Sequence, residues 1–539
     1  MNTTSMRDQG IVLQPFNVDP DDSSPLLVLG KVVTMDGTII EDGAVYCRRG
    51  SIAAVQRRTE PTPAGFEHAV RLDTQGVIYP GLIDLHNHLN YNVLPLWNPP
   101  QQYGDRYEWR SEATYKRDIS QPMAAILAKG LSAAVIRYVE AKLLVGGTTS
   151  SQGMSLKSGS KQFYRGMVRN LEQTEDARLP EIQTQLEDLF GLDNQGKAKM
   201  RQQLDAGARM FHHLAEGRNQ RAHKAYEDSR ALAFPRGNYV GIHTTGLIGA
   251  DYAEFAQTGA KAVWSPTSNS LLYGETVEIA RFLGSGLTWG LGCDWSPSGT
   301  KNLLGEMKVA LLAAQAAGVH LSYQTLAEAV TVRAASVVGW EKTLGKLSTG
   351  FYADLLVLRP KVADPYENLV RATERDIALV VIAGVPRYGD KTLMQQTGIA
   401  AGKLESRTVA GRPRALFFEH PEAPPQMNGL PLATAIAHLE AGMRDLTTPP
   451  PPIPLFRALG FEDDLLGLEL EMDLPPGTVL PAAEGEGSVQ VLDTQPLPPL
   501  TSVPLDPLTV VDDPDFFPRL EAVDHAPAYM RDLRGLYQD

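Results

Sequence analysis

Between residues 81 and 345, short apolar segments alternate with stretches of helical character, and this alternation is the strongest constraint on the fold. The apolar segments are 148–153, 208–213, 238–243, 262–266 and 288–294, with helix-like stretches such as 123–146 and 251–259 between them. Short buried strands alternating with helices are typical of a parallel sheet. A closed (β/α)8 TIM barrel is the usual solution at this length, so we predict one over residues 81–345.

The two flanks of this segment have β character. Residues 24–80 and 346–409 carry short β-rich runs punctuated by Gly, Asp and Pro, which is the pattern of strands joined by tight turns. We predict that they pair as one small β-sandwich domain, built from both sides of the barrel. The polar residues 1–23 are predicted to be a flexible lead-in.

Residues 410–539 differ in composition from the rest of the chain. They include four consecutive prolines, 449–452, and such runs fit neither helix interiors nor central strands. The apolar pieces of this segment need a surface to bury against. We therefore expect a Pro-rich C-terminal extension that lies on the main body, stabilises a subunit contact or the rim of the site, and supplies no metal ligand.

Composition limits the classes of binding partner and the cellular compartments that we expect for this chain. The 539-residue chain has a net charge of -13, which repels phosphate backbones and argues against nucleic-acid binding. No segment approaches the roughly 18 apolar residues of a membrane span, and the first residues lack the apolar core of a secretory signal. The two cysteines, Cys47 and Cys293, lie far apart, which favours a reducing compartment. We expect a cytoplasmic homo-oligomer that acts on a small molecule.

Several predicted strands end in His or Asp. His86 and His88 follow an apolar run, and residues i and i+2 of a strand point to the same face. His243 ends 238–243, and Asp294 ends 288–294, where a buried carboxylate is costly unless it is paired or binds a metal. Taken alone, the histidine pair is equally explained as surface residues, and Asp294 is better explained as a helix cap or turn.

His212 and His213 both end the segment 208–213, and they point opposite ways in a regular strand. Spacing alone leaves open which of them faces the barrel interior. Only 11 histidines occur in the chain, so a chance concentration at these strand ends is improbable. Active sites of such barrels lie at the carboxyl ends of the strands, and the set therefore indicates a metal site there.

Across roughly residues 24–390 the sequence resembles the amidohydrolase superfamily, and within it the cytosine deaminase and triazine hydrolase-like branch. The ordered series of motifs is what makes the resemblance specific. In chain order the motifs are GVIYPGLIDLHNH, GGTTSSQG, HLAEG, GIHTTGL, SPTSN, LGCDWSPSG and LGKLSTGFYADLLVL.

The resemblance implies a ligand set and selects His213 over His212, because HLAEG is similar to the HxxE motif of the family. A family member with a bridging carbamate needs a lysine at the fourth strand, where this chain has Arg169 and Asn170. Lys157 is the alternative. We therefore expect one divalent ion per chain, Zn²⁺ before Fe²⁺ or Mn²⁺. The implied metal ligands are His86, His88, His213 and Asp294.

The resemblance also implies that Glu216 and His243 handle protons. Zinc lowers the pKa of a bound water to about 7, and Asp294 is placed to accept a proton from that water. Glu216 would then protonate a leaving nitrogen, and His243 would stabilise the developing charge. Without the motif, Glu216 would be interpreted as a solvated loop carboxylate.

The sequence identifies substrate contacts less clearly than metal ligands. The loop after His88 is rich in aromatic residues, and the first strand–helix loop of a barrel borders the active site; most of these aromatics are expected to pack the loop. Deaminases of the branch usually carry a different sequence at this point. The candidate substrate contacts are Tyr91, Trp97, Arg169, Asn170, Ser265, Asn269 and Trp295.

These observations favour a hydrolase that cleaves a non-peptide C–N bond in an amide, urea, carbamate or cyclic amide. The alternative is an aminohydrolase that deaminates a heteroaromatic ring, for which ammonia release would be diagnostic. A third class, a non-catalytic barrel scaffold, would not need an intact set of ligands and proton carriers.

Overall fold

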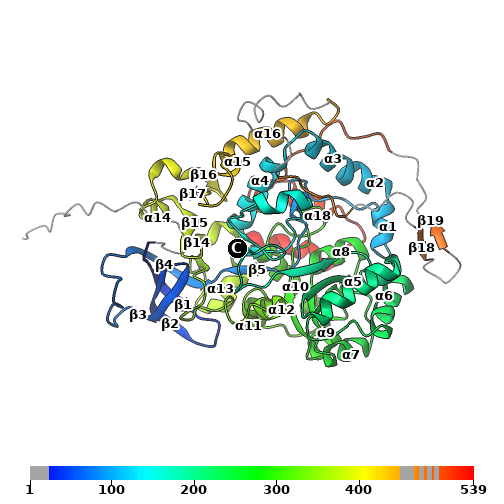
Figure 1. The fold of residues 1–539 in the computed structure, drawn as a ribbon, viewed down its shortest axis with the longest axis horizontal. Coiled ribbons are helices and arrows are strands. Elements are labelled where there is room, and N and C mark those ends of the chain that lie inside the picture. Colours follow the sequence, from blue (N-terminus) through cyan, green and yellow to red (C-terminus); the bar gives the residue numbers. More distant parts are fainter. Residues whose placement is uncertain (1–23, 449–465, 473–478, 482–487, 491–496, 539) are drawn as a thin grey trace, which may run out of the picture.

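The computed structural model describes residues 24–448, 466–472, 479–481, 488–490 and 497–538. Strands and helices alternate through the middle of the chain, and a separate nine-stranded sheet lies at one end of the molecule (Figure 1). The α/β class predicted from the sequence is therefore confirmed. The lead-in 1–23 and the prolines 449–452 lie outside the described residues.

Two parallel sheets form the centre of the fold. The first contains β5 (Leu82–Asp84), β6 (Thr148–Ser151) and β7 (Arg169–Asn170). The second contains β8 (Ile182–Gln185), β9 (Arg209–Leu214), β10 (Tyr239–His243), β11 (Lys261–Trp264) and β12 (Thr288–Leu291).

Backbone hydrogen bonds connect these two sheets at both edges. The amide of Asp294, after β12, donates to the carbonyl of His86, after β5, over 2.8 Å. The amide of Ile182 in β8 donates to the carbonyl of Leu171, after β7, over 3.0 Å. Because all neighbouring pairs are parallel, the carboxyl ends of the strands meet on one side.

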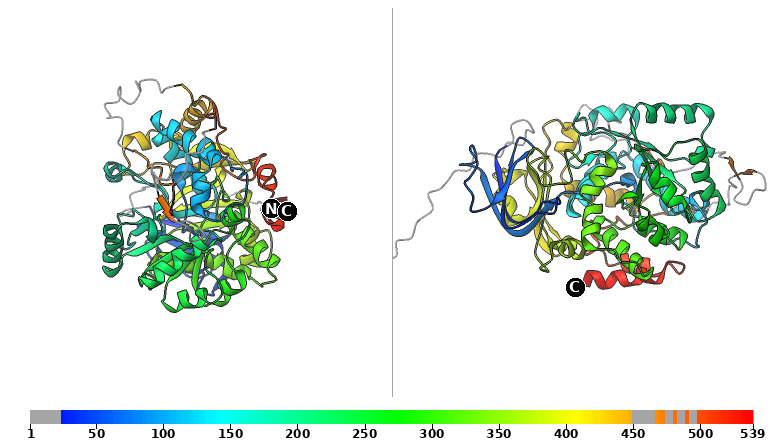
Figure 2. Two further views of the ribbon diagram at one scale, coloured as in Figure 1. Left: turned by 90° about the vertical axis from the view of Figure 1, so that its right-hand side faces the viewer. Right: turned by 90° about the horizontal axis from the view of Figure 1, so that it is seen from below.

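Helices follow the strands of the second sheet and lie around it (Figure 2). Polar side chains fix where some of them start: Asn219 accepts from the amide of Ala222, and Asn302 from that of Leu304. The helices are α5 (Asn194–Asp205), α6 (Gln220–Ala231), α7 (Asp251–Gln257), α8 (Pro266–Tyr273), α9 (Ile279–Gly284), α10 (Leu303–Ala316), α11 (Tyr323–Ala329) and α12 (Val332–Val338).

The helix expected over 123–146 is two helices. The break falls at Gly130, whose φ of 70° is the left-handed conformation that ends helices and favours glycine. These helices are α3 (Gln121–Ala128) and α4 (Ser132–Val145). Shorter elements before and after them are η1 (Leu89–Tyr91), α1 (Arg106–Ser111), α2 (Ala113–Tyr115), η2 (Lys116–Ser120), η3 (Ser158–Phe163) and η4 (Leu189–Gly191).

A nine-stranded sheet combines both flanks of the central segment. In this sheet β4 (Val70–Pro80) pairs in parallel with β1 (Leu26–Val33) and antiparallel with β13 (Leu355–Leu358). The other strands are β2 (Ile39–Arg48), β3 (Ser51–Arg57), β14 (Ile377–Ile382), β15 (Val385–Asp390), β16 (Glu405–Val409) and β17 (Arg412–Leu416). The helices of this region are α13 (Pro365–Arg371), η5 (Glu374–Asp376), α14 (Lys391–Gln395) and η6 (Ala401–Lys403).

Gly81 divides the run that precedes the first histidine pair. A Cβ at this position would lie 2.3 Å from the side chain of Thr149 in β6, so the close approach of the strands requires glycine. The residues up to Pro80 belong to β4 in the nine-stranded sheet, and those from Leu82 belong to β5. His86 and His88 are therefore carried by the parallel sheets.

The described parts of the C-terminal extension pack on the main body. The apolar face of α16 (Leu432–Arg444) lies against α4, beside α3 (Figure 1). At the end of the chain, η7 (Ala528–Arg534) contacts α10 and α18 (Phe516–Glu521). The remaining elements are α15 (Pro425–Asn428), β18 (Val479–Pro481), β19 (Ser488–Gln490) and α19 (Gly535–Gln538).

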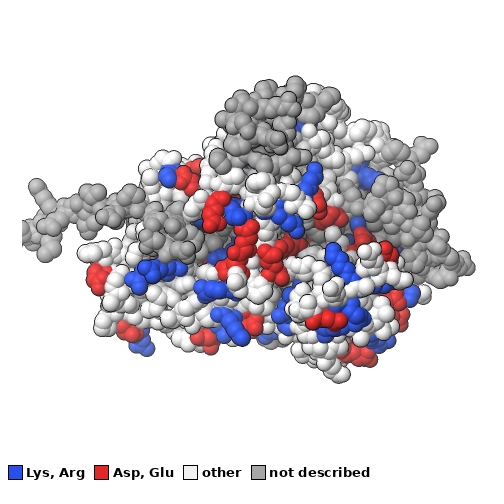
Figure 3. Space-filling model, in the orientation of Figure 1, with Lys and Arg blue, Asp and Glu red and all other residues white. Residues whose placement is uncertain are grey.

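The surface and the cysteines bear on the expectations from composition. Acidic and basic side chains are interspersed across the face drawn in Figure 3. Among the described helices, none has both the length and the apolar character that crossing a bilayer requires. Cys47 and Cys293 are both buried and free, so they form no disulfide.

Candidate metal centre

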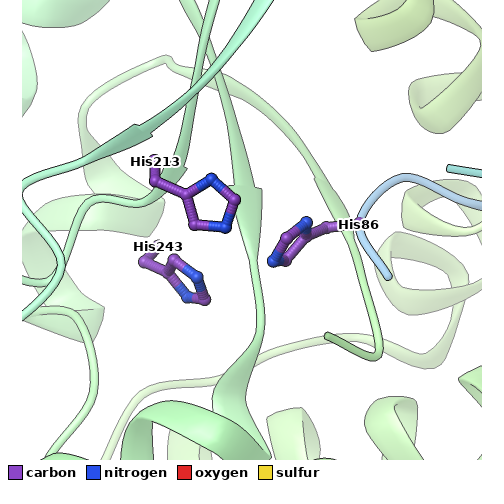
Figure 4. A group of neighbouring side chains, drawn as sticks. All are labelled: His86, His213 and His243. Carbon is purple, nitrogen blue, oxygen red and sulfur yellow. The ribbon is translucent and has the colours of Figure 1, made fainter. Parts of the chain in front are cut away.

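Three histidines at or just after the ends of three parallel strands point their rings toward one another (Figure 4). The ring centroid of His86 lies 4.8 Å from that of His213 and 5.1 Å from that of His243. His213 belongs to β9 and His243 ends β10, and all three side chains are buried. Potential ligand atoms of the three rings lie within 4.8 Å of one another, which is close enough to share one cation.

A second group, His86, His88 and Asp294, shares the same space. Asp294 Oδ1 lies 3.2 Å from His86 Nε2 and 3.5 Å from His88 Nε2, and His88 Nε2 lies 3.3 Å from His213 Nε2. Two ligand atoms bound tetrahedrally to zinc at about 2.1 Å are about 3.4 Å apart. The observed separations therefore fit the donor set of a tetrahedral site.

The backbone is strained where the strands of this site end. Ala215, His243 and Asp294 have φ values of 53°, 67° and 65°. Residues with a Cβ avoid this left-handed region, at a cost of order 1 kcal/mol each. His243 and Asp294 belong to the candidate site and Ala215 directly precedes Glu216, so part of the strained backbone lies where the functional side chains are positioned.

Burial and neighbouring charges set the protonation of the cluster. Burial lowers the pKa of His213 and of His243, because an imidazolium is poorly solvated in the interior. Burial acts in the same direction on His86, but its hydrogen bond to Asp294 and the charge of that residue raise the pKa overall. Burial opposes ionisation of Asp294, yet its contacts with His86 lower its pKa. Metal ligation requires neutral imidazoles and an ionised carboxylate.

His212 faces away from the cluster. Its Nε2 lies 3.1 Å from the carbonyl oxygen of Glu187, and its Nδ1 contacts the hydroxyl of Tyr239. Burial lowers the pKa of His212 to about 4. Of the two adjacent histidines, the structure brings only His213 to His86 and His88.

Polar side chains support three of the histidines through Nδ1, the ring nitrogen directed away from the proposed ligand position. Such contacts orient the ring and fix which nitrogen is free to bind a metal. Gln152 lies in the GGTTSSQG motif after β6, whereas no local pattern distinguishes Glu471 in the sequence. The pairs are His86 with Gln152 at 3.0 Å, His88 with Glu471 at 2.9 Å and His243 with Asn269 at 3.0 Å.

Glu216 lies beside the cluster in a polar setting. The hydroxyl of Tyr273 donates to Glu216 Oε1 over 2.6 Å, and Trp109 Nε1 donates to that hydroxyl over 2.9 Å. Glu216 Oε2 lies 3.6 Å from His243 Nε2 and 3.5 Å from Arg106 Nε. Sequence reasoning identified Glu216 by its motif but missed the tyrosine, because Tyr273 comes from α8 with no signal of its own.

Aromatic rings line one side of the site. The ring of Trp295 lies 6.0 Å from that of His88, 5.3 Å from that of Tyr91 and 5.7 Å from that of Trp109. All of these side chains are buried. Trp97 stacks on Tyr103 with centroids 6.2 Å apart. The structure therefore brings Trp295 to the cluster, with Tyr91 packed against Trp295, whereas Trp97 packs the aromatic loop.

Arg169 and Asn170 are directed elsewhere. Arg169 Nη1 forms an ion pair with Asp354 over 2.5 Å, between β7 and the nine-stranded sheet. Asn170 Nδ2 donates to the carbonyl of Met154 over 3.3 Å. Both line a cavity of about 560 Å³ whose described walls include none of the clustered histidines.

Of the remaining candidates, one contacts the histidine cluster and the others do not. Asn269 reaches His243, as noted, and also donates to Thr276 Oγ1 over 3.2 Å. Ser265 is buried at the start of α8, where its hydroxyl has no hydrogen-bond partner among the described residues. Lys157, the alternative source of a carbamate, is exposed.

Buried histidines and a carboxylate at the carboxyl ends of parallel strands, with a second carboxylate beside them, are typical of metal-dependent hydrolases with α/β folds. Residues 204–387 match the model of the amidohydrolase family. This part of the chain is an amidohydrolase family domain, and the family resemblance of the sequence is confirmed.

Relatives extend the likeness over most of the chain. A 5-methylthioadenosine/S-adenosylhomocysteine deaminase of Syntrophus aciditrophicus is 23% identical over 433 residues, covering 68% of this chain and 93% of the relative. An adenosine deaminase of Xanthomonas campestris with bound zinc has a TM-score of 0.56 at 19% identity, covering 70% of this chain and 94% of that one. A zinc-bound atrazine chlorohydrolase of Arthrobacter aurescens has a TM-score of 0.52 at 20% identity, covering 67% and 94%. These structures share the fold of this chain.

Proposed function

We propose that this protein is a metal-dependent hydrolase that cleaves a non-peptide C–N bond of a small molecule. The observation that carries the proposal is the set of ligand-atom separations, 3.2, 3.3 and 3.5 Å, among His86, His88, His213 and Asp294. The family match at 204–387 supports it. We further propose that the parallel strands β5 to β12 close as a (β/α)8 barrel around this site, with the nine-stranded sheet as a small β domain.

One divalent ion would be held by the four proposed ligands. The mixed nitrogen and oxygen donor set suits Zn²⁺, with Fe²⁺ and Mn²⁺ as alternatives. Buried His86 Nε2 and Asp294 Oδ1 lie 3.2 Å apart, and neither forms a hydrogen bond with a further described residue, as expected of ligand atoms. When bound, the ion would supply Lewis acidity, which lowers the pKa of a water to about 7.

The residues of the chain would perform the proton transfers. Asp294, ionised beside the histidines, would accept a proton from the attacking water. Glu216 would deliver a proton to the leaving nitrogen, held in place by Tyr273 at 2.6 Å. Because burial lowers the pKa of His243, its neutral ring would orient the water or the substrate rather than act as a cation.

Replacing Glu216 with glutamine is expected to lower kcat by roughly 10² or more, as for the loss of a general acid. The amide keeps the shape of the side chain and can still accept from Tyr273, so metal content and fold should be retained. Steady-state kinetics with metal analysis would check this. Glu227→Gln on the exposed side of α6 is the control, and a Glu216→Gln variant as active as that control would reduce Glu216 to a packing residue.

Deamination of a heteroaromatic ring is the second candidate. Two observations favour it: the ring of Trp295 beside His88, with the ring of Tyr91 packed against Trp295, and relatives named as deaminases. Flat aromatic substrates stack well on such rings. This reaction would use the same proton carriers, with the exocyclic nitrogen leaving as ammonia.

The proposal is tested by metal analysis followed by a substrate screen. The purified chain is expected to hold about one divalent ion, as in a mononuclear hydrolase site. The zinc-loaded enzyme should then hydrolyse members of a panel of amides, ureas, carbamates and aminated heterocycles, and ammonia assays would separate the two candidates. A chain that binds no divalent ion would favour the scaffold alternative, and two tightly bound ions would contradict the mononuclear site.

The cytoplasmic location and the homo-oligomer remain predictions. Two buried free cysteines are in keeping with a reducing compartment. Sedimentation of the full chain would determine the oligomeric state, and the expected result is a species larger than the monomer.

A further inference from the structure

A short segment of the C-terminal extension, residues 466–472, docks beside the candidate metal centre. The amide of Lys157 donates to the carbonyl of Gly467 over 3.0 Å, and the amide of Glu469 donates to that of Ser155 over 3.0 Å. Leu156 and Leu468 form an antiparallel bridge between these bonds. Residues 467–469 therefore pair with residues 155–157, which follow β6, through one antiparallel bridge flanked by two backbone hydrogen bonds.

Polar side chains of the main body hold both sides of the docked segment. Asn90 Nδ2 donates to the carbonyl of Glu469 over 2.7 Å, and the amide of Met472 donates to the hydroxyl of Tyr91 over 3.2 Å. Arg110 Nε donates to the carbonyl of Met472 over 2.6 Å. Because these contacts lie on both sides of Glu471, they fix the position of its backbone.

Glu471 reaches His88 from this fixed backbone. Its Oε1 lies 2.9 Å from His88 Nδ1, although the two residues are 383 positions apart in sequence. The Glu471 side chain is 9% exposed and that of His88 is 1% exposed, so water screens the contact little. His88 Nε2, on the other side of the ring, faces Asp294 and His213.

We propose that Glu471 is a positioning residue for the metal centre, acting through His88. The carboxylate accepts a hydrogen bond from the Nδ1–H group of His88. This bond fixes the tautomer in which Nε2 is free to bind a metal, and it makes Nε2 a stronger metal ligand. The contact adds no ligand to the site, since Glu471 lies against the opposite nitrogen. This inference rests on the proposed metal site.

The arrangement differs in kind from the support of the other histidines. His86 and His243 contact the neutral amides of Gln152 and Asn269, which follow neighbouring strands. At Nδ1, His88 is the one of these three histidines that contacts a carboxylate, and that carboxylate is supplied by the extension. Assembly of a fully active centre is thereby coupled to docking of residues 466–472.

The test is zinc affinity of the full-length protein, measured by competition with a chromogenic chelator. Glu471→Ala is expected to weaken zinc binding by about 10- to 100-fold, as for loss of a carboxylate partner of a ligating histidine. Glu471→Gln keeps the size and one acceptor oxygen but loses the charge, so its affinity should fall between those of Glu471→Ala and the wild type. Cobalt substitution gives a second readout, because a reoriented His88 changes the visible absorption of the bound ion.

Glu469→Gln is the matched control, since its side chain is exposed while its backbone docks the same segment. It should retain wild-type affinity and cobalt spectrum. Wild-type affinity and an unchanged spectrum in Glu471→Gln and in folded Glu471→Ala would overturn the positioning role and leave the proposed function intact. Absence of zinc binding by the wild type would instead overturn the metal site itself.

Discussion

Replacing His86 or His213 with alanine is expected to strip the protein of its divalent ion and to abolish turnover. Both imidazoles are buried, and their Nε2 atoms lie 3.2 Å and 3.3 Å from the nearest other candidate ligand atoms, Asp294 Oδ1 and His88 Nε2. Loss of one of four ligands leaves an incomplete donor set for zinc. Metal analysis after desalting, together with circular dichroism for the fold, would check the result.

His212→Ala is the matched control for this experiment. It removes an equally buried imidazole from the adjacent position of β9, but one directed at Glu187 and Tyr239. Some stability should be lost, because a buried hydroxyl and a carbonyl lose their partner, while the metal should stay. Metal loss from a folded His212→Ala protein, with metal retained in His213→Ala, would mean that the register of β9 has been misassigned.

The clustering of the strand-end histidines follows from local periodicity and from the parallel pairing of the strands. His86, His213 and His243 each close an apolar run, and parallel pairing brings such ends together whatever the details of the helices. The same regularity could not show that the run before His86 belongs to two sheets. That division depends on Gly81 meeting Thr149, a contact between strands far apart in sequence.

The sequence could not identify residues that reach the site only through contacts between distant parts of the chain. Tyr273 reaches Glu216 from α8, and Glu471 reaches His88 across 383 residues. Neither has a periodic pattern that marks it. Arg169 was proposed for the site because a fourth strand was expected there, but β7 has only two residues, and the ion pair with Asp354 directs the arginine toward the nine-stranded sheet.

The C-terminal extension also depends on contacts that composition does not reveal. The sequence predicted that the extension lies on the main body but not which residues attach it, and Asp506 is completely buried. The Asp506 carboxylate lies between the ammonium groups of Lys142 and Lys301. Its backbone amide donates to the carbonyl of Val93 over 2.9 Å. The extension is thus tied to α4 and to the loops around the candidate site.

Replacing Asp506 with alanine is expected to destabilise the fold by about 3–5 kcal/mol, the usual cost of leaving buried charges without their partner. Lys301 would keep Asp513 at 2.9 Å. Lys142 would keep only neutral acceptors, the carbonyl of Asn92 at 2.8 Å and Ser296 Oγ at 2.7 Å. Urea unfolding would measure the change, with Asp524→Ala on the exposed surface of the extension as a control that should lie within about 0.5 kcal/mol of the wild type.

The pH dependence of this deficit identifies its origin. Burial lowers the pKa of Lys142 to about 8 against the pull of Asp506, so in Asp506→Ala the pKa falls further. Folded Lys142 then releases its proton at a pH where the unfolded chain still binds it, and the free energy of unfolding rises with pH in that range. Wild-type Lys142 stays charged below about pH 8, so its contribution to the free energy of unfolding does not change with pH in that range. The deficit of Asp506→Ala should therefore shrink between about pH 6 and pH 8. A deficit that stays constant over this range would show that the buried charge of Lys142 is not its cause.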